Sequence, residues 1–267
     1  AGGIGLAAVC EESSHLEPWQ RRWSTGQTGW HVEEAHPILK RFLGELLPTA
    51  PAGDGLGPRV LFPLCGKTVD MPFLASKGYR VVGVEGVEQA IQELAKAHGS
   101  TGQSVPITLP RPLAGRYRGH AILVRNIDGT SAPLQPPVLV VEGNFFGIGQ
   151  AEAQALVPFD AAFDRGSLVA VAPSERSRYV QVLSDLVAPG GRVLLVTVEH
   201  DAFADGRLGP PFEVSEADVH ALFNRSFDVK FLQREDVLDK DPGLKARGCT
   251  HFHECAYLLT RKSLASL

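Results

Sequence analysis

Short apolar runs alternate with amphipathic stretches along this chain, and the alternation predicts strands that are followed by helices. The runs RVLFPL, from residue 59, and RVVGVE, from residue 80, are continuous enough to predict strands that are covered on both faces. Between them, residues 67–77 carry apolar side chains at helical spacing, and Gly78 marks the expected end of that helix. A β-α-β unit of a parallel sheet is therefore expected to begin at residue 59.

The same alternation continues toward the C-terminus. We expect a helix over residues 87–97, core strands at VLVVEGNFF and RVLLVTVEH, and a helix over SERSRYVQVLSDLVAPGG that closes at Gly190 and Gly191. FDVKFLQRED and THFHECAYLLTRK predict the last two strands. Because no predicted helix separates these two, one of them should be an antiparallel strand at the edge of the sheet. The whole pattern predicts an α/β sandwich with a mostly parallel sheet.

Two segments do not follow this alternation of strands and helices. Residues 1–15 show no periodic pattern, and we expect a flexible N-terminal tail followed by one domain over residues 16–267. Residues 109–137 contain Asp128-Gly129 and a cluster of prolines between two β-rich runs. An Asp-Gly pair favours a tight hairpin turn, so this segment is expected to form an inserted, hairpin-like flap.

Composition narrows the classes of partner. The net charge of −4 comes without a block of like charge, so neither a nucleic acid nor a membrane surface is expected as a partner. The four cysteines include no CxxC pair, which favours reduced thiols in a cytoplasmic protein. We expect a monomer that acts on a small molecule.

The turn after the first strand is the first candidate for chemistry. Leu64, Cys65 and Gly66 precede a helix whose N–H groups are available to a ligand, and Glu85 ends the next strand. A carboxylate at that place can accept hydrogen bonds from both ribose hydroxyls, whereas a pyrophosphate would need more glycines in the turn. A ligand that carries a ribose and no phosphate therefore fits better than NAD or FAD. A plain strand-to-helix turn and a solvated carboxylate are the alternatives.

Further candidates follow the next two core strands. Asn144 and Phe145 could read an adenine edge and pack on its face, although a core phenylalanine beside a turn asparagine fits the same spacing. Asp164 and Arg165 follow in AFDRGSL, where an arginine can orient an anionic substrate. A structural Asp–Arg pair is the alternative there.

Aromatic residues gather before the sheet. Trp19, Trp23, Trp30 and His31 could form a lid, whose rings would attract a sulfonium by cation–π interaction, or could only anchor a helix. Near the C-terminus, alternate positions carry Cys249, His251, His253 and Cys255. Ligands spaced along one strand spread over about 13 Å and cannot converge on one tetrahedral ion, so no metal site is expected.

Together, WxxxW with GxTGWH, LFPLCGKTVDMPFLASKGYRVVGVE, DRGSLVAV, GPPFEVS and the closing YLLT resemble the thiopurine S-methyltransferases over about residues 16–262. The resemblance implies a Rossmann-like, three-layer sandwich with a seven-stranded sheet that binds S-adenosylmethionine (SAM). It assigns cofactor contacts to Trp19, Trp23, Trp30, Leu64, Glu85, Asn144, Phe145 and Arg165. We expect Gly66, the glycine of the turn, to contact the cofactor as well.

On the same resemblance, Trp30 lies where the family has an aromatic side chain that touches the heterocyclic substrate, with His31 beside it. Arg165 lies beside the substrate sulfur, and with Asp164 it is the expected catalytic pair. The chain departs from vertebrate relatives at a second substrate-site arginine, for which Lys245 and Arg247 are candidates.

The expected reaction is methyl transfer from SAM to the sulfur of an aromatic or heterocyclic thiol, which yields S-adenosylhomocysteine. Such an enzyme aligns a thiolate with an electrophilic carbon and excludes water, and needs no dedicated general base. Alternatives are a methyltransferase for selenium, tellurium or other small thiol substrates, and a relative that binds the cofactor without turnover.

Overall fold

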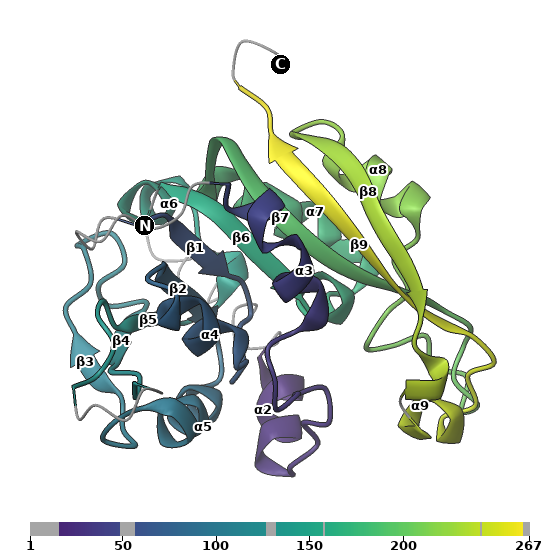
Figure 1. Cartoon of the computed structure of the whole chain (residues 1–267), viewed down its shortest axis with the longest axis horizontal. Helices are drawn as coiled ribbons and strands as arrows, with labels where there is room; N and C mark the ends of the chain where they lie inside the picture. The colour runs from purple at the N-terminus through teal and green to yellow at the C-terminus, as the bar shows by residue number, and fades with distance from the viewer. Residues whose placement is uncertain (1–15, 49–56, 127–131, 157, 241, 264–267) are drawn as a thin grey trace, which may run out of the picture. The chain divides into compact units, whose positions relative to one another are not determined.

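The computed structural model describes residues 16–48, 57–126, 132–156, 158–240 and 242–263 (Figure 1). The expected tail over residues 1–15 lies outside them. The chain divides into two compact units, which we describe in turn. The first comprises residues 1–36 and 51–156, and the second comprises residues 37–50 and 157–267.

In the first unit, helices alternate with strands along the chain. Its elements are α2 (Glu17–Ser24), β1 (Arg59–Phe62), α4 (Asp70–Ser76), β2 (Arg80–Glu85), α5 (Glu88–His98), β3 (Val105–Ile107), β4 (Arg118–Ile122), β5 (Val138–Glu142), the 3₁₀ helix η1 (Phe145–Gly147) and α6 (Gln150–Leu156).

The strands of the first unit lie in the order β3-β4-β5-β2-β1. β1, β2 and β5 are parallel, so their carboxyl ends share one edge of the sheet. β2 is buried at all positions but its first, and α4 and α5 pack against it, which confirms the expected β-α-β unit. The helix begins at Asp70 and not at residue 67. Asp70 is buried and accepts hydrogen bonds from the Thr68 hydroxyl (2.8 Å) and the His36 amide (2.7 Å), which hold the preceding residues in a turn.

The expected flap is partly a component of the sheet. β4 pairs antiparallel with β5 along its whole length and with β3 on its other side, so residues 118–122 extend the sheet. Antiparallel β4 and β5 are what a hairpin around Asp128-Gly129 predicts, but the turn itself lies outside the described residues.

The second unit is built around the longest strand. Its elements are α3 (Pro37–Leu46), β6 (Phe159–Arg165), the 3₁₀ helices η2 (Leu168–Ala170) and η3 (Pro173–Glu175), α7 (Arg176–Leu186), β7 (Val187–His200), α8 (Glu216–Phe223), β8 (Phe227–Asp236), the 3₁₀ helix η4 (Leu238–Lys240), α9 (Pro242–Ala246) and β9 (Phe252–Arg261).

The strands of the second unit lie in the order β6-β7-β9-β8, with α3 and α7 packed on β7 and α8 packed on β8. β6 and β7 are parallel, whereas β9 is antiparallel to both β7 and β8. The expected antiparallel strand therefore exists, but it lies between two neighbours and not at the edge. The short helix α9 also lies between the last two strands, where none was expected.

The described residues contain five strands in the first unit and four in the second, so the expectation of seven was wrong. The excess is β3 and β4: β3 has only three residues and contains a proline, and β4 lies within the segment that was expected to form a flap. The expected helix end at Gly190 was also wrong, because α7 stops at Leu186 and Gly190 lies within β7. Pro189 removes a donor and disfavours a helical conformation at Ala188, which explains the earlier stop. In the part of the chain described, no helix is long and apolar enough to cross a membrane.

Candidate functional site

The turn that follows β1 has an unusual backbone. Leu64 has φ 44° and Gly66 has φ 54°, which places both in the left-handed region. A leucine rarely adopts this conformation, so the surrounding contacts must hold it there. The Cys65 amide donates to the Val84 carbonyl (3.0 Å), which ties the turn to β2. The strained position is therefore fixed by the neighbouring strand.

Glu85 closes this turn from the end of β2. Its side chain is buried, Oε2 accepts a hydrogen bond from the Gly66 amide (2.7 Å), and Oε1 accepts one from the Val87 amide (2.8 Å). A carboxylate has about four acceptor positions, so about two remain after these bonds. The arrangement suits a ligand that offers two adjacent hydroxyl donors.

The environment of Glu85 opposes its ionisation. Burial raises its pKa most, and the nearby Glu142 raises the pKa further, while the hydrogen bonds from the Val87 and Gly66 amides, and more weakly the neighbouring Gly86 amide, lower it. Burial and the charge of Glu85 also raise the pKa of the Cys65 thiol well above its ordinary value. Cys65 is therefore held as a neutral thiol, a form that is a poor nucleophile.

The aromatic residues before the sheet cover the same turn. Trp30 packs edge-to-face on Trp19 and Trp23, with centroids 5.7 and 6.4 Å apart, and the His31 ring lies 5.1 Å from Trp23. A Cβ atom at Gly66 would lie 2.9 Å from the His31 ring, so glycine is required there by both its φ and its neighbour. Trp23 also joins a buried cluster with Val87 and Ala90, so it anchors α2 to α5 as well.

Asn144 and Phe145 follow β5 at the same edge of the sheet. The Gly143 amide donates to the Glu85 carbonyl (2.8 Å), which joins this segment to the end of β2. Asn144 Oδ1 accepts from the Phe146 amide (3.0 Å) and its carbonyl accepts from the Tyr117 hydroxyl (3.0 Å). Phe145 is buried against Phe146. Asn144 therefore caps the 3₁₀ helix η1 and Phe145 is a core residue, which is the structural alternative given for this pair in the sequence.

Asp164 and Arg165 end β6 in the second unit. Asp164 is fully buried, and its carboxylate accepts hydrogen bonds from the Tyr179 hydroxyl (2.7 Å) and the Leu168 amide (3.1 Å). Burial raises the pKa of Asp164 to about 6, against the lowering effect of these donors. These bonds make Asp164 a support for the turn that carries Arg165, which is half-buried.

The Cys and His residues near the C-terminus are divided by the start of β9. Cys249 and His251 precede this strand, whereas His253 and Cys255 lie on it, opposite Glu199 and Thr197 of β7. Across the described ranges, no three His, Cys, Asp or Glu side chains gather in a way that could hold a metal ion. Of the two candidate basic residues, Lys245 pairs with Asp239, and Arg247 lies over the Phe203 ring.

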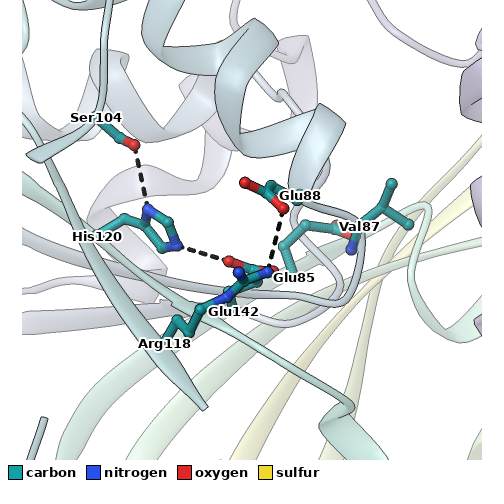
Figure 2. Close-up of polar contacts among 7 residues, drawn as sticks. All are labelled: Glu85, Val87, Glu88, Ser104, Arg118, His120 and Glu142. Carbon is teal, nitrogen blue, oxygen red and sulfur yellow. Dashed lines mark hydrogen bonds and ion pairs between the residues drawn. The ribbon is translucent and has the colours of Figure 1, made fainter. Parts of the chain in front are cut away.

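A polar cluster that was not expected from the sequence lies beside Glu85. Glu142 ends β5, and its Oε2 lies 2.7 Å from Nε2 of His120, while Arg118 forms an ion pair with the same carboxylate (Figure 2). Both basic residues lie on β4, Arg118 directly opposite Glu142 and His120 two positions farther along the strand. The alternation in RGHAI, opposite a strand that ends in Glu, was the signal that could have found this cluster.

Comparison with known proteins decides the family. The family model described as Thiopurine S-methyltransferase (TPMT) matches residues 14–262. The chain belongs to this family. A thiopurine S-methyltransferase of Xanthomonas campestris pv. campestris is 33% identical over 243 residues, which cover 91% of this chain and 97% of the relative. The thiopurine S-methyltransferase of Bos taurus is 33% identical over 247 residues, which cover 92% of this chain and 90% of the relative.

Solved structures show the same fold at lower sequence identity. A SAM-dependent methyltransferase from Methanosarcina mazei superposes with a TM-score of 0.53 at 14% identity, covering 86% of this chain and 99% of the other. The 1,6-didemethyltoxoflavin-N1-methyltransferase of Burkholderia thailandensis, solved with S-adenosylhomocysteine, has a TM-score of 0.51 at 18% identity, covering 98% and 92%. The chain is thus a SAM-dependent S-methyltransferase of the thiopurine S-methyltransferase family.

Proposed function

We propose that this protein methylates the sulfur of aromatic or heterocyclic thiols, with SAM as methyl donor and S-adenosylhomocysteine as product. The observation that carries the proposal is Glu85, a buried carboxylate at the carboxyl end of β2 that keeps about two acceptor positions beside a glycine turn. The names of the curated relatives support thiopurine-like acceptors.

The residues of the turn fit SAM better than a dinucleotide. Gly66 is the single glycine in the turn, and the His31 ring stands against it, so the close approach that a pyrophosphate requires is not provided. We propose that Glu85 accepts the two ribose hydroxyls, that Leu64 and Gly66 line the cofactor through their backbone, and that Asn144 and Phe145 face the adenine. SAM supplies a methyl group on a positively charged sulfur, which needs no further activation by the protein.

The aromatic residues have two proposed tasks. Trp19, Trp23 and Trp30 exclude water and offer ring faces to the sulfonium, because an aromatic face attracts a cation most strongly when water is absent. Trp30 and His31 contact the acceptor ring. The edge-to-face packing among the tryptophans favours fixed ring positions, which support both tasks.

We propose that Arg165 favours the thiolate form of the acceptor, since a nearby positive charge lowers the pKa of a thiol. Asp164 then acts through Arg165 by holding its turn, because both of its oxygens are engaged by Tyr179 and Leu168. We further propose that the enzyme works as a monomer in the cytoplasm. The three described cysteines are free thiols, which suits a reducing compartment.

Methyl transfer can be tested with methyl-labelled SAM and a panel of acceptors. The panel contains a mercaptopurine, a thiophenol, an aliphatic thiol, and selenium and tellurium compounds. The proposal predicts label on the sulfur of the aromatic and heterocyclic thiols, with the highest kcat/KM among the panel. Transfer confined to selenium or tellurium would assign the protein to the alternative substrates. Tight binding of S-adenosylhomocysteine without any turnover would make it a non-catalytic relative.

A further inference from the structure

Two carboxylates stand side by side at the proposed ribose site. Glu85 and Glu142 are directly paired in the register of the parallel strands β2 and β5, so their side chains project from the same face of the sheet. Both are buried, with exposed fractions of 7%. Like charges at such a pair of positions repel, and burial strengthens the repulsion. Something must offset the charge of Glu142 if Glu85 is to stay ionised.

Two side chains of β4 contact Glu142 and offset its charge. His120 is buried and lies 2.7 Å from Glu142 through Nε2, and its Nδ1 lies 3.1 Å from the Ser104 hydroxyl (Figure 2). Because an ionised carboxylate only accepts, the proton on Nε2 is donated to Glu142. Arg118 binds the other oxygen of Glu142 and also lies 3.2 Å from Glu88. Glu142 thus has a basic partner on each of its oxygens.

Glu85 must be ionised for its proposed task. It already accepts two backbone hydrogen bonds, and two ribose hydroxyls would use its remaining acceptor positions. A protonated carboxyl has a donor in place of one acceptor and cannot receive all four. Cofactor affinity should therefore fall when Glu85 takes up a proton.

We propose that Glu142, ion-paired with Arg118 and hydrogen-bonded to His120, is a positioning residue that sets the affinity for the cofactor by controlling the charge of Glu85. This inference rests on the proposed role of Glu85 in binding the ribose. The cluster does not touch the reacting atoms, and its effect is electrostatic. The pKa of Glu85, which Glu142 raises, supports the coupling between the two carboxylates.

The elements next to Glu85 in the first unit carry several titratable groups. They belong to the β1 turn, to the segment after α2, to α5, and to β4 and β5: Cys65, Lys67, His31, Glu88, Glu93, Arg118, His120 and Glu142. Lys67 and Glu93 neutralise each other in an ion pair of 2.7 Å. Glu142 is the carboxylate that is both buried and in direct register with Glu85, so its removal should change the titration of Glu85 most.

Calorimetric titration with S-adenosylhomocysteine between pH 4.5 and 8 tests this coupling. The loss of affinity on acidification should shift to lower pH in Glu142→Gln and to higher pH in Arg118→Gln, by on the order of half to one pH unit. On the acidic side of the midpoint, this corresponds to about a 3- to 10-fold change in Kd. The double variant Arg118→Gln/Glu142→Gln should return the midpoint toward that of the wild type. A purely structural role would lower Tm without moving the midpoint.

Two further variants separate the possible outcomes. Glu88→Gln removes an exposed carboxylate that also binds Arg118, and it should move the midpoint much less than Glu142→Gln does. Glu85→Gln should weaken binding across the pH range. If Glu85→Gln weakens binding but the other variants leave the midpoint in place, the coupling is overturned and the ribose site stands. If Glu85→Gln binds as tightly as the wild type, both proposals are overturned.

Discussion

Glu85 and Glu142 are directly paired at the carboxyl ends of β2 and β5, and both are buried. Folding gains nothing from two like charges in register, since burial penalises each of them and repulsion adds to the penalty. Glu85 organises the β1 turn through two backbone amides, and Glu142 is held by Arg118 and His120. An arrangement that costs stability is expected at a binding site, where the ligand supplies the missing donors.

Gly66→Ala should weaken both folding and cofactor binding. The left-handed backbone costs a residue with a side chain about 1–2 kcal/mol, and the new Cβ would lie 2.9 Å from the His31 ring. The comparison is Gly102→Ala, at φ 71° with no atom within 4 Å of the added Cβ. Denaturant unfolding should show a lower free energy of unfolding in both variants, whereas Kd for S-adenosylhomocysteine should rise in Gly66→Ala alone. Equal Kd values in the two variants would contradict the placement of the cofactor at this turn.

Asp164→Asn should change how stability depends on pH. The pKa of Asp164 is raised from 3.8 to about 6 in the folded chain, so the folded state binds more protons than the unfolded state between these values. Its contribution to the free energy of unfolding is therefore present below about pH 4 and lost as pH rises through about 6, by roughly 3 kcal/mol.

The asparagine cannot titrate, so the difference in free energy of unfolding between variant and wild type should shift in favour of the variant over this pH window. Urea unfolding at pH 4, 5, 6 and 7 measures that difference. A difference that stays constant over the four values would show that folding does not raise the pKa of Asp164.

Arg165→Gln should reduce turnover more than cofactor binding. A hydrogen bond to a charged group is worth about 1.5–3 kcal/mol, which corresponds to about a 10- to 100-fold loss in kcat/KM for an aromatic thiol. The pH profile of the rate should move to higher pH, because the bound thiol loses a neighbouring positive charge. The control is Arg234→Gln on β8, which removes an exposed ion pair with Glu199. An unchanged pH profile in Arg165→Gln would rule out the proposed effect on the thiolate.

The sequence carried enough information to predict the elements whose periodicity is strong. RVLFPL and RVVGVE are apolar because α/β packing covers both faces, so β1, β2 and the turn between β1 and α4 could be located, along with Gly66 and Glu85. RGHAI was expected only as part of a β-rich run beside the flap, and not as a strand of the central sheet. Its buried positions include His120, whose ring nitrogens are satisfied by Glu142 and Ser104. The alternation of Arg118 and His120 marks one side of this cluster, but their partner Glu142 lies 22 to 24 residues farther along the chain, and the sequence pattern alone does not pair them.

The central claim is that Glu85 binds the ribose of the cofactor, and a two-way comparison of Kd tests it most directly. S-adenosylhomocysteine and its analogue without the ribose 2′-hydroxyl are titrated calorimetrically into the wild type, Glu85→Gln and the control Glu93→Gln, which removes the partner of Lys67 on α5. We predict that Glu85→Gln weakens S-adenosylhomocysteine binding about 10- to 100-fold, and that loss of the hydroxyl costs the wild type and the control about tenfold but costs Glu85→Gln little. An equal loss for the analogue in all three proteins would contradict the claim.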